Sequence, residues 1–399
     1  MRSFAIGRFA AIAGWQMISV AVGWQLYERT GDAWALGLVG AAELTPVLFL
    51  MIVAGNAADR YPRRNVGIFA HALLTIAAIG LALVSWLDGP TYAIYSLLVL
   101  VGSARAFASP SVNTILPQLL APAEFANANA WLSSTFQLAA ITGPAVGGML
   151  IAVTGAATVP FAAAAAGQLI FIGMLRTLPR RTPPPATDRR SAKDLFAGFR
   201  FVRQNPLFLS AITLDLFGVL FGGAVALLPL FARDILDVGP IGLGVLRSAP
   251  AVGALFAGIM LTRRPLRGMA GRKLLVVVGV FGGSMVVFGL SHSFALSFAA
   301  LSVSGFADMI SMNIRSMITA LATPDALRGR VNAVEMVFIS ASNELGAFES
   351  GAAAALVGAV PAVVVGGCLT IAAALLWPRL FRPMARIDRL ESLHPAGGT

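Results

Sequence analysis

The sequence predicts an all-α polytopic membrane protein, with twelve transmembrane helices arranged as two pseudo-symmetric six-helix bundles. Of the 399 residues, 57% are hydrophobic and only 12% are charged, whereas a soluble protein has about 25% charged residues. The apolar residues form twelve stretches near the ~20 residues that a helix needs to cross a bilayer. The two halves of the chain also repeat small residues at a constant spacing, since Gly102 matches Gly305 and Gly143 matches Gly346.

Each predicted helix corresponds to one apolar stretch. The first six lie at about 9–27, 35–58, 66–87, 91–111, 128–153 and 156–175. The second six lie at about 208–231, 242–262, 273–291, 294–321, 332–356 and 360–378. The repeat also pairs Asn129 with Asn332 and Gly148 with Gly351, which indicates an internal duplication. Parallel repeats of six helices occur in one large class of transporters, in which the substrate binds between the repeats near the middle of the membrane.

These stretches divide the chain into four parts. We predict an N-terminal bundle at 1–176, a cytoplasmic linker at 177–206, a C-terminal bundle at 207–380 and a cytoplasmic tail at 381–399. Within the linker, Leu195, Phe199 and Val202 follow one another at helical spacing. This pattern predicts an amphipathic helix that lies on the membrane surface.

The lysines and arginines predict the orientation of the chain in the membrane. With a cytoplasmic N-terminus, 24 of the 29 basic residues fall in inside segments, and only Arg29 and Arg233 fall outside. Because basic residues concentrate in cytoplasmic loops, both termini are predicted to be cytoplasmic. The net charge of +11 is then explained by orientation and by contact with anionic membrane lipids. We therefore expect no nucleic-acid partner.

The sequence gives no support for an enzymatic function. The single cysteine, Cys368, lies in an apolar stretch, so the chain can form neither an intramolecular disulfide nor a metal site built from cysteines. The three histidines are far apart and lack the spacing of metal ligands, and the sequence has no phosphate-binding loop. We expect no metal and no cofactor.

A dense group of charges lies between the second and third predicted helices, in what we predict to be a short loop. The motif consists of Gly55 and the charged residues Asp59, Arg60, Arg63 and Arg64. They resemble the signature loop of the major facilitator superfamily, Gly-x-Leu-x-Asp-Arg-x-Gly-Arg-Arg, with Ala57 and Pro62 as the two departures. The resemblance implies that Asp59 and Arg60 form a gating latch that clamps the two bundles together in the outward-facing state. A charge cluster that only sets the orientation of the chain is the alternative.

The fifth predicted helix contains a second motif of this superfamily. Its residues are Gly143, Pro144, Gly147 and Gly148, and they resemble the Gly-Pro-x-x-Gly-Gly core of the superfamily's exporters. Glycines four residues apart let a neighbouring helix approach closely, and a proline inside a helix removes a backbone hydrogen bond. Ordinary packing of small residues is the alternative interpretation.

Three further stretches narrow the resemblance to one branch of the superfamily. They are 23–32, with Gly-Trp-Gln-Leu-Tyr at its start, 106–110, and 343–351. Together they look like the enterobactin exporter-like branch, whose members are bacterial exporters of siderophores and other secreted small molecules. The resemblance covers the chain up to about Arg382. It implies the major facilitator fold, a location in the bacterial cytoplasmic (inner) membrane, and efflux of a siderophore, drug or secreted metabolite.

Ionisable residues inside the predicted helices are candidates for proton coupling, because each one costs at least ~2.5 kcal/mol to insert. A proton-driven exporter needs an acid whose pKa rises on burial and falls when water or a cation reaches it. The candidate acids are Glu344, Glu349, Glu43, Asp215 and Asp308. Glu335 lies near the cytoplasmic end, where we expect it to meet Arg328 or Arg330. For each acid, a structural ion pair is the alternative.

Other polar residues are candidates for lining a substrate cavity. They are Arg105, Arg247, Gln16, Gln137, Asn313 and Asn343. Arg105 is similar to the superfamily's helix-4 arginine, which is linked to proton transfer, but Ala108 and Ser109 replace the residues that normally follow it. Arg105 and Arg247 are alternatively suited to hold an anionic substrate.

We therefore predict a secondary active transporter that exports small amphipathic molecules by alternating access. We expect a proton antiporter, driven by the proton gradient and active as a monomer, with multidrug resistance as one expected outcome. Two alternatives are an importer or facilitator with the same fold, and a membrane sensor or scaffold that does not transport.

Overall fold

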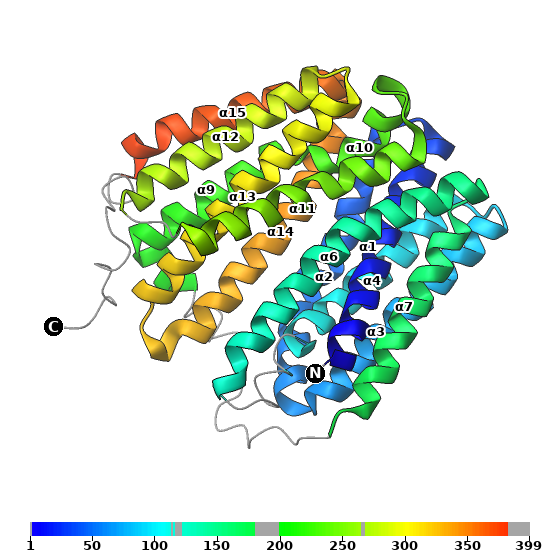
Figure 1. Cartoon of the computed structure of the whole chain (residues 1–399), viewed down its shortest axis with the longest axis horizontal. Helices are drawn as coiled ribbons and strands as arrows, with labels where there is room; N and C mark the ends of the chain where they lie inside the picture. Colours follow the sequence, from blue (N-terminus) through cyan, green and yellow to red (C-terminus); the bar gives the residue numbers. More distant parts are fainter. Residues whose placement is uncertain (1, 113–114, 116–121, 180–198, 265–267, 382–399) are drawn as a thin grey trace. The chain divides into compact units, whose positions relative to one another are not determined.

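The computed structural model describes residues 2–112, 115, 122–179, 199–264 and 268–381, and their regular structure is entirely helical. Figure 1 shows the helices in chain order. Those that precede the linker are α1 (Arg2–Thr30), α2 (Ala33–Arg60), α3 (Arg63–Trp86), α4 (Thr91–Val112), α6 (Pro122–Thr154) and α7 (Thr158–Thr177). Those that follow it are α9 (Pro206–Gly222), η1 (Ala224–Leu227), α10 (Leu228–Leu230), η2 (Phe231–Ile235), α11 (Gly239–Arg263), α12 (Ala270–Leu290), α13 (Phe294–Ala322), α14 (Asp325–Val357) and α15 (Ala359–Leu380).

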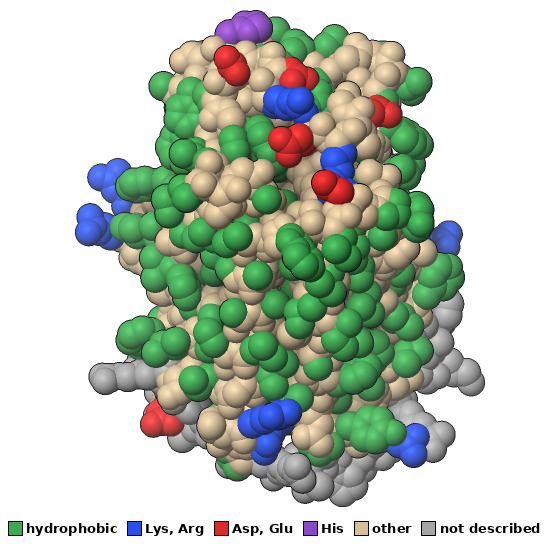
Figure 2. Space-filling view, turned by 90° about the vertical axis from the view of Figure 1, so that its right-hand side faces the viewer, with side chains coloured by type: hydrophobic (Ala, Val, Ile, Leu, Met, Phe, Trp, Pro, Cys, Tyr) green, Lys and Arg blue, Asp and Glu red, His purple; other side chains and the backbone are tan. Residues whose placement is uncertain are grey.

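Eleven or twelve of these segments are long enough to span the membrane, in agreement with the prediction. Within the described residues, eleven are long and apolar enough to be recognised by length and composition, counting 206–235 as one. The twelfth is α14, whose 33 residues extend for about 50 Å but include several polar side chains. Figure 2 shows one face of the molecule, where hydrophobic side chains cover the broad middle and charged side chains gather mainly toward one end. Such an apolar belt is what contact with lipid requires.

The seventh predicted helix, 208–231, is interrupted in the structure. Helix α9 ends at Gly222, Gly223 follows it, and a short 3₁₀-helix leads into α10 and the π-helical turn η2. Two consecutive glycines lower the helical preference locally, and Pro229 removes one backbone donor just beyond them. The apolar composition predicted the span correctly but did not reveal the break.

The described chain forms two compact units. The first unit contains residues 1–190 and 228–248, and the second contains residues 191–227 and 249–399. The predicted bundles follow the order of the chain, whereas the contacts group the segment 228–248 with the first unit. In the first unit, α1 packs against α6 and α7, and in the second unit α12 packs against α13 and α15 (Figure 1).

Each unit contains the same close contact between two helices. In the first unit, a Cβ at Gly102 of α4 would lie 2.3 Å from the carbonyl oxygen of Glu43 and 2.8 Å from Pro46 of α2. In the second unit, a Cβ at Gly305 of α13 would lie 1.9 Å from the carbonyl oxygen of Pro250 of α11. Gly102 and Gly305 are the pair that the sequence repeat aligned. The repeat therefore has a structural counterpart, in which a glycine admits the backbone of a proline-containing helix.

Of the linker, residues 177–179 and 199–206 are described. Residues 199–204 are helical, and Val202 is buried in a cluster with Phe208 of α9 and Val331 of α14. This side chain therefore packs on protein, although the sequence pattern assigned it to a membrane-surface helix. Leu195 and the three consecutive prolines at 183–185 lie outside the described residues.

The contact at Gly305 predicts a strong effect of even one added methyl group. We expect Gly305→Ala to lower the free energy of unfolding by about 1–3 kcal/mol, because the two backbones must separate to admit the methyl group. The matched control is Gly258→Ala on α11, where a Cβ would meet nothing within 4 Å. Thermal unfolding of the purified protein in detergent measures both. Equal midpoints for the two variants would show that the contact is not constrained.

Candidate functional site

The second unit contains a stripe of polar side chains along one face of α13. Asp308, Ser311, Arg315 and Thr319 follow one another at spacings of three, four and four residues. Since a helix has 3.6 residues per turn, these side chains lie above one another on the same face. Ile310, Ile314 and Ile318 of the same helix are buried in an apolar cluster.

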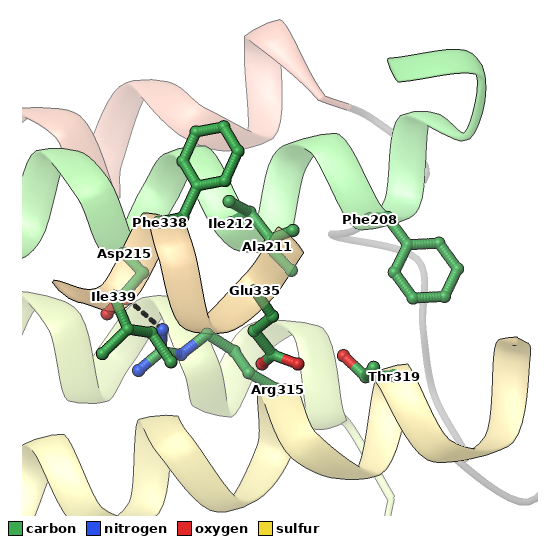
Figure 3. A pocket seen from close by; sticks show the side chains of 9 residues that line it. All are labelled: Phe208, Ala211, Ile212, Asp215, Arg315, Thr319, Glu335, Phe338 and Ile339. Atoms are coloured by element: carbon green, nitrogen blue, oxygen red, sulfur yellow. Dashed lines mark ion pairs between the residues drawn. The ribbon is translucent and has the colours of Figure 1, made fainter. Parts of the chain in front are cut away.

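Arg315 is the central cation of this stripe. Its guanidinium forms an ion pair with the carboxylate of Asp215 from α9 (Figure 3). The two side chains are only 9% and 11% exposed. The Nε atom of Arg315 is buried and has no hydrogen-bond partner among the described residues. The ion pair thus uses Nη1 of the guanidinium and does not involve the Nε–H group.

A small cavity lies next to this pair. Its lining comes from three helices: Phe208, Ala211, Ile212 and Asp215 of α9, Arg315 and Thr319 of α13, and Glu335, Phe338 and Ile339 of α14. In Figure 3 the carboxylate of Glu335 points toward the hydroxyl of Thr319. The volume of about 10 Å³ is close to what one water molecule requires. The structure therefore places Glu335, which sequence reasoning assigned to Arg328 or Arg330, in the lining of the same cavity as Arg315.

A second cavity of about 20 Å³ lies on the other side of Asp215. It is lined by Asp215, Gly218 and Val219 of α9, Val277, Val278 and Phe281 of α12, and Ala307, Asp308 and Ser311 of α13. Asp215 is therefore shared by both cavities. Asp215 and Asp308, which were predicted separately as coupling candidates, belong to one cluster with Arg315 and Glu335.

The first unit contains a different charged group. Arg105 of α4 forms an ion pair with Glu43 of α2, and its guanidinium also lies 4.7 Å from the centre of the Trp15 ring of α1. The pair unites a residue predicted to couple protons with one predicted to bind substrate. A cation held between a carboxylate and an aromatic face is stabilised by both.

The other predicted site residues are dispersed. Arg247 donates a hydrogen bond to the Ser19 hydroxyl of α1 within the first unit. Gln16 lies on α1 against Gly143. Glu344 and Glu349 are partly buried on α14, and neither lines the two cavities around Arg315. The remaining amides are Gln137 and Asn313, which are partly buried, and Asn343, which is exposed.

The motif at 55–64 is almost entirely helical. Gly55 to Arg60 end α2, Arg63 begins α3, and only Tyr61 and Pro62 separate them. The predicted loop is thus shorter than expected, because Pro62 is compatible with the start of the next helix. Arg64 donates a hydrogen bond of 2.7 Å to the carbonyl oxygen of Leu178 after α7. The side chain of Asp59 lies outside the described part of the chain, so the latch stays a prediction.

The glycines of the exporter motif let α6 approach two neighbours in the first unit. A Cβ at Gly143 would lie 2.9 Å from the carbonyl oxygen of Ala13, and one at Gly147 would lie 3.3 Å from Met17, both on α1. A Cβ at Gly148 would lie 2.2 Å from the carbonyl oxygen of Pro240 in α11. The small residues of this motif therefore allow close contact, with α1 at Gly143 and Gly147 and with α11 at Gly148.

A polar contact that the sequence did not indicate lies at the C-terminal end of α1. The Tyr27 hydroxyl donates a hydrogen bond to the carboxylate of Asp234 in η2. Arg233 donates to the Tyr27 carbonyl oxygen at 3.3 Å, and its guanidinium lies 5.9 Å from the Tyr27 ring. Tyr27 is buried, with 5% exposure. This contact attaches the segment 228–248 to α1.

The sequence identified Arg315 and Glu335 as ionisable residues inside predicted helices but did not assign them to a common site, and it did not indicate Tyr27 or Asp234. For Arg315 a signal was available, because Asp308, Arg315 and Thr319 share one helical face. For Tyr27 and Asp234 no pattern could have paired residues so far apart in the sequence.

The ion pair between Asp215 and Arg315 predicts a strong energetic coupling. We expect Asp215→Ala and Arg315→Ala each to lower the free energy of unfolding by about 3–5 kcal/mol, because the remaining charge is left buried. The double variant should cost clearly less than the sum of the two. Unfolding midpoints of all three measure the coupling, and Asp88→Asn is the control, since Asp88 pairs with Arg29 but is 95% exposed. Additive effects would contradict the pairing.

The contact at Tyr27 predicts a local change in dynamics. A hydrogen bond to a charged group contributes about 1.5–3 kcal/mol, so we expect Tyr27→Phe to raise amide hydrogen exchange in residues 230–238 roughly tenfold or more. Tyr95→Phe is the matched control, because its hydroxyl donates to the Ala35 carbonyl oxygen within the same unit. If both variants exchange alike in this segment, Asp234 is not held by Tyr27.

Comparison with known proteins agrees with this architecture. A family model described as transmembrane secretion effector matches residues 1–395. The enterobactin exporter EntS of Shigella boydii serotype 18 is 31% identical over 338 residues, which cover 83% of this chain and 79% of that protein. EntS of Escherichia coli O139:H28 shows the same identity and coverage.

Solved transporter structures share the fold. A POT family transporter in complex with 5-aminolevulinic acid has a TM-score of 0.76 at 11% identity, over 96% of both chains. The nucleoside transporter NupG has a TM-score of 0.69 at 14% identity, over 96% of this chain and 98% of that one. Together with the match over nearly the whole sequence, this places the chain in the transmembrane secretion effector family, within the enterobactin exporter-like branch of the major facilitator superfamily.

Proposed function

We propose that this transporter is a proton antiporter that exports small amphipathic molecules by alternating access. It acts as a monomer in the bacterial cytoplasmic membrane, with both termini in the cytoplasm, and it uses the proton gradient in place of a cofactor. The observation that supports this proposal is the group of three acids around Arg315 in the second unit.

The charges of this group are unbalanced. Asp215, Asp308 and Glu335 are among the residues that line the two cavities, and the single basic residue among them is Arg315, which lines the first cavity. With every group ionised, the cluster would hold two more negative than positive charges. Carboxylates at membrane depth are costly unless they are paired or protonated. The cluster is therefore suited to bind and release protons, which is the property that a proton antiporter needs.

Similarity to known exporters supports the direction of transport and the class of substrate. The relatives at 31% identity are named enterobactin exporters, and this chain covers 79% of the first of them. The stretch from Gly143 to Gly148 resembles the exporter motif of the superfamily, and its glycines lie in close contacts with neighbouring helices. A catecholate siderophore such as enterobactin is thus the first substrate to test.

Transport driven by an imposed pH gradient tests the proposal. We expect enterobactin to accumulate in proteoliposomes with an acidic lumen, since an antiporter exchanges internal protons for external substrate. In Asp308→Asn the accumulation should no longer respond to the gradient, because an amide cannot carry the proton. Asp88→Asn is the control, as this exposed carboxylate lies outside the cluster. If wild-type transport proceeds at the same rate with and without the gradient, proton antiport is wrong.

A further inference from the structure

The polar stripe of α13 connects the two cavities of the second unit. Thr319 lines the first cavity, Asp308 and Ser311 line the second, and the pair of Asp215 and Arg315 lies between them. The eleven steps from Asp308 to Thr319 correspond to about 16 Å along the helix axis. This is about half of the ~30 Å hydrocarbon thickness of a bilayer.

Few of the side chains that line the two cavities can bind or release a proton. The lining residues from α12 are Val277, Val278 and Phe281, and α14 adds Phe338 and Ile339. Among the residues that line the cavities, the groups that titrate or bear a charge are Asp215, Asp308, Arg315 and Glu335. Arginine does not lose its proton in proteins. The three carboxyl groups are therefore the available proton carriers.

Water can complete the connection between these carriers. The cavities of about 10 and 20 Å³ are of the size that holds one or two water molecules. The Nε of Arg315, on a residue that is 7% exposed, has no protein partner among the described residues and belongs to a side chain that lines the first cavity. A buried N–H without a protein partner is commonly satisfied by water.

We propose that Glu335 and Asp308 are the two ends of an internal proton path, in which Thr319, Asp215 and Ser311 are the intermediate groups. The inference rests on the proposed proton antiport and specifies which groups transmit the proton. Arg315 has a positioning role, since it stays charged and fixes the carboxylate of Asp215 between the two cavities.

In each transfer, one proton moves along the path from Glu335 to Asp308. The carboxylic acid of Glu335 gives its proton to water beside the Thr319 hydroxyl, which passes one proton on as it accepts another, and Glu335 becomes a carboxylate. Asp215 accepts the proton, which weakens its attraction to Arg315. Asp215 then releases the proton through water and the Ser311 hydroxyl to Asp308. Each donor becomes an anion as its acceptor becomes neutral, so charge and protons balance.

Thr319 provides the sharpest test, because its hydroxyl can be removed without changing the shape of the side chain. We expect Thr319→Val to reduce enterobactin accumulation driven by a pH gradient several-fold. Exchange of labelled for unlabelled enterobactin at equal concentrations should proceed at the wild-type rate, since it requires no net proton movement. Thr370→Val is the matched control: this hydroxyl is also buried in the second unit but donates to the Gly366 carbonyl oxygen on α15.

Infrared spectroscopy of the purified protein in nanodiscs provides a readout that needs no substrate. We expect the absorption of protonated carboxyl groups to titrate with pH in the wild type, and to lose one component each in Glu335→Gln and Asp308→Asn. In Thr319→Val both components should remain, with slower proton uptake after a pH jump.

The outcomes separate the two proposals. If the wild type ignores the gradient, the proposed antiport fails, whatever the spectra show. If the wild type responds to the gradient but Thr319→Val and Glu335→Gln transport and titrate like Thr370→Val, the path is wrong while antiport stands. If Thr319→Val slows exchange as much as gradient-driven transport, Thr319 acts in structure or substrate binding, and the path is likewise wrong.

Discussion

The ion pair between Asp215 and Arg315 is the interaction on which the chemistry of the second unit depends. A guanidinium at membrane depth requires an anion, and the low polarity of its surroundings makes the attraction strong and the loss of either partner costly. Because Asp215 comes from α9 and Arg315 from α13, the pair also fixes the two helices relative to each other. Arg315 holds its positive charge beside the first cavity, and its partner Asp215 lines both cavities.

The two units share their packing but differ in their chemistry. Gly102 and Gly305 make equivalent contacts with proline-containing helices, and the same alignment places Asp308 opposite Arg105. In the first unit Arg105 pairs with Glu43, so that one cation meets one anion. In the second unit the aligned position is an acid that faces a cavity. Duplication therefore preserved the positions where backbones touch, while charged positions diverged.

The sequence was sufficient to predict the twelve spans, because about 20 apolar residues in succession have few other stable arrangements. It could not predict the break after Gly222, since the mean composition of 206–235 remains apolar throughout. The sequence also could not show which side chains on different helices pair with each other. Asp215, Arg315 and Glu335 are each recognisable in the sequence as ionisable residues inside a predicted helix, but only the packing of α9, α13 and α14 brings them together. The spacing of polar residues along α13 was the part of the site that the sequence did contain.

The balance of charge distinguishes a structural role from a coupling role for membrane acids. A pair with one cation and one anion, such as Glu43 with Arg105, satisfies both charges and has little reason to change protonation. A group with more acids than cations cannot be satisfied in this way, because the excess carboxyl groups need a proton whenever water is excluded. This argument favours Asp308 and Glu335 over Glu43 as the groups that respond to the gradient. Asp308 lies at one end of the polar stripe, and Glu335 of α14 lines the first cavity with Thr319 at the other end.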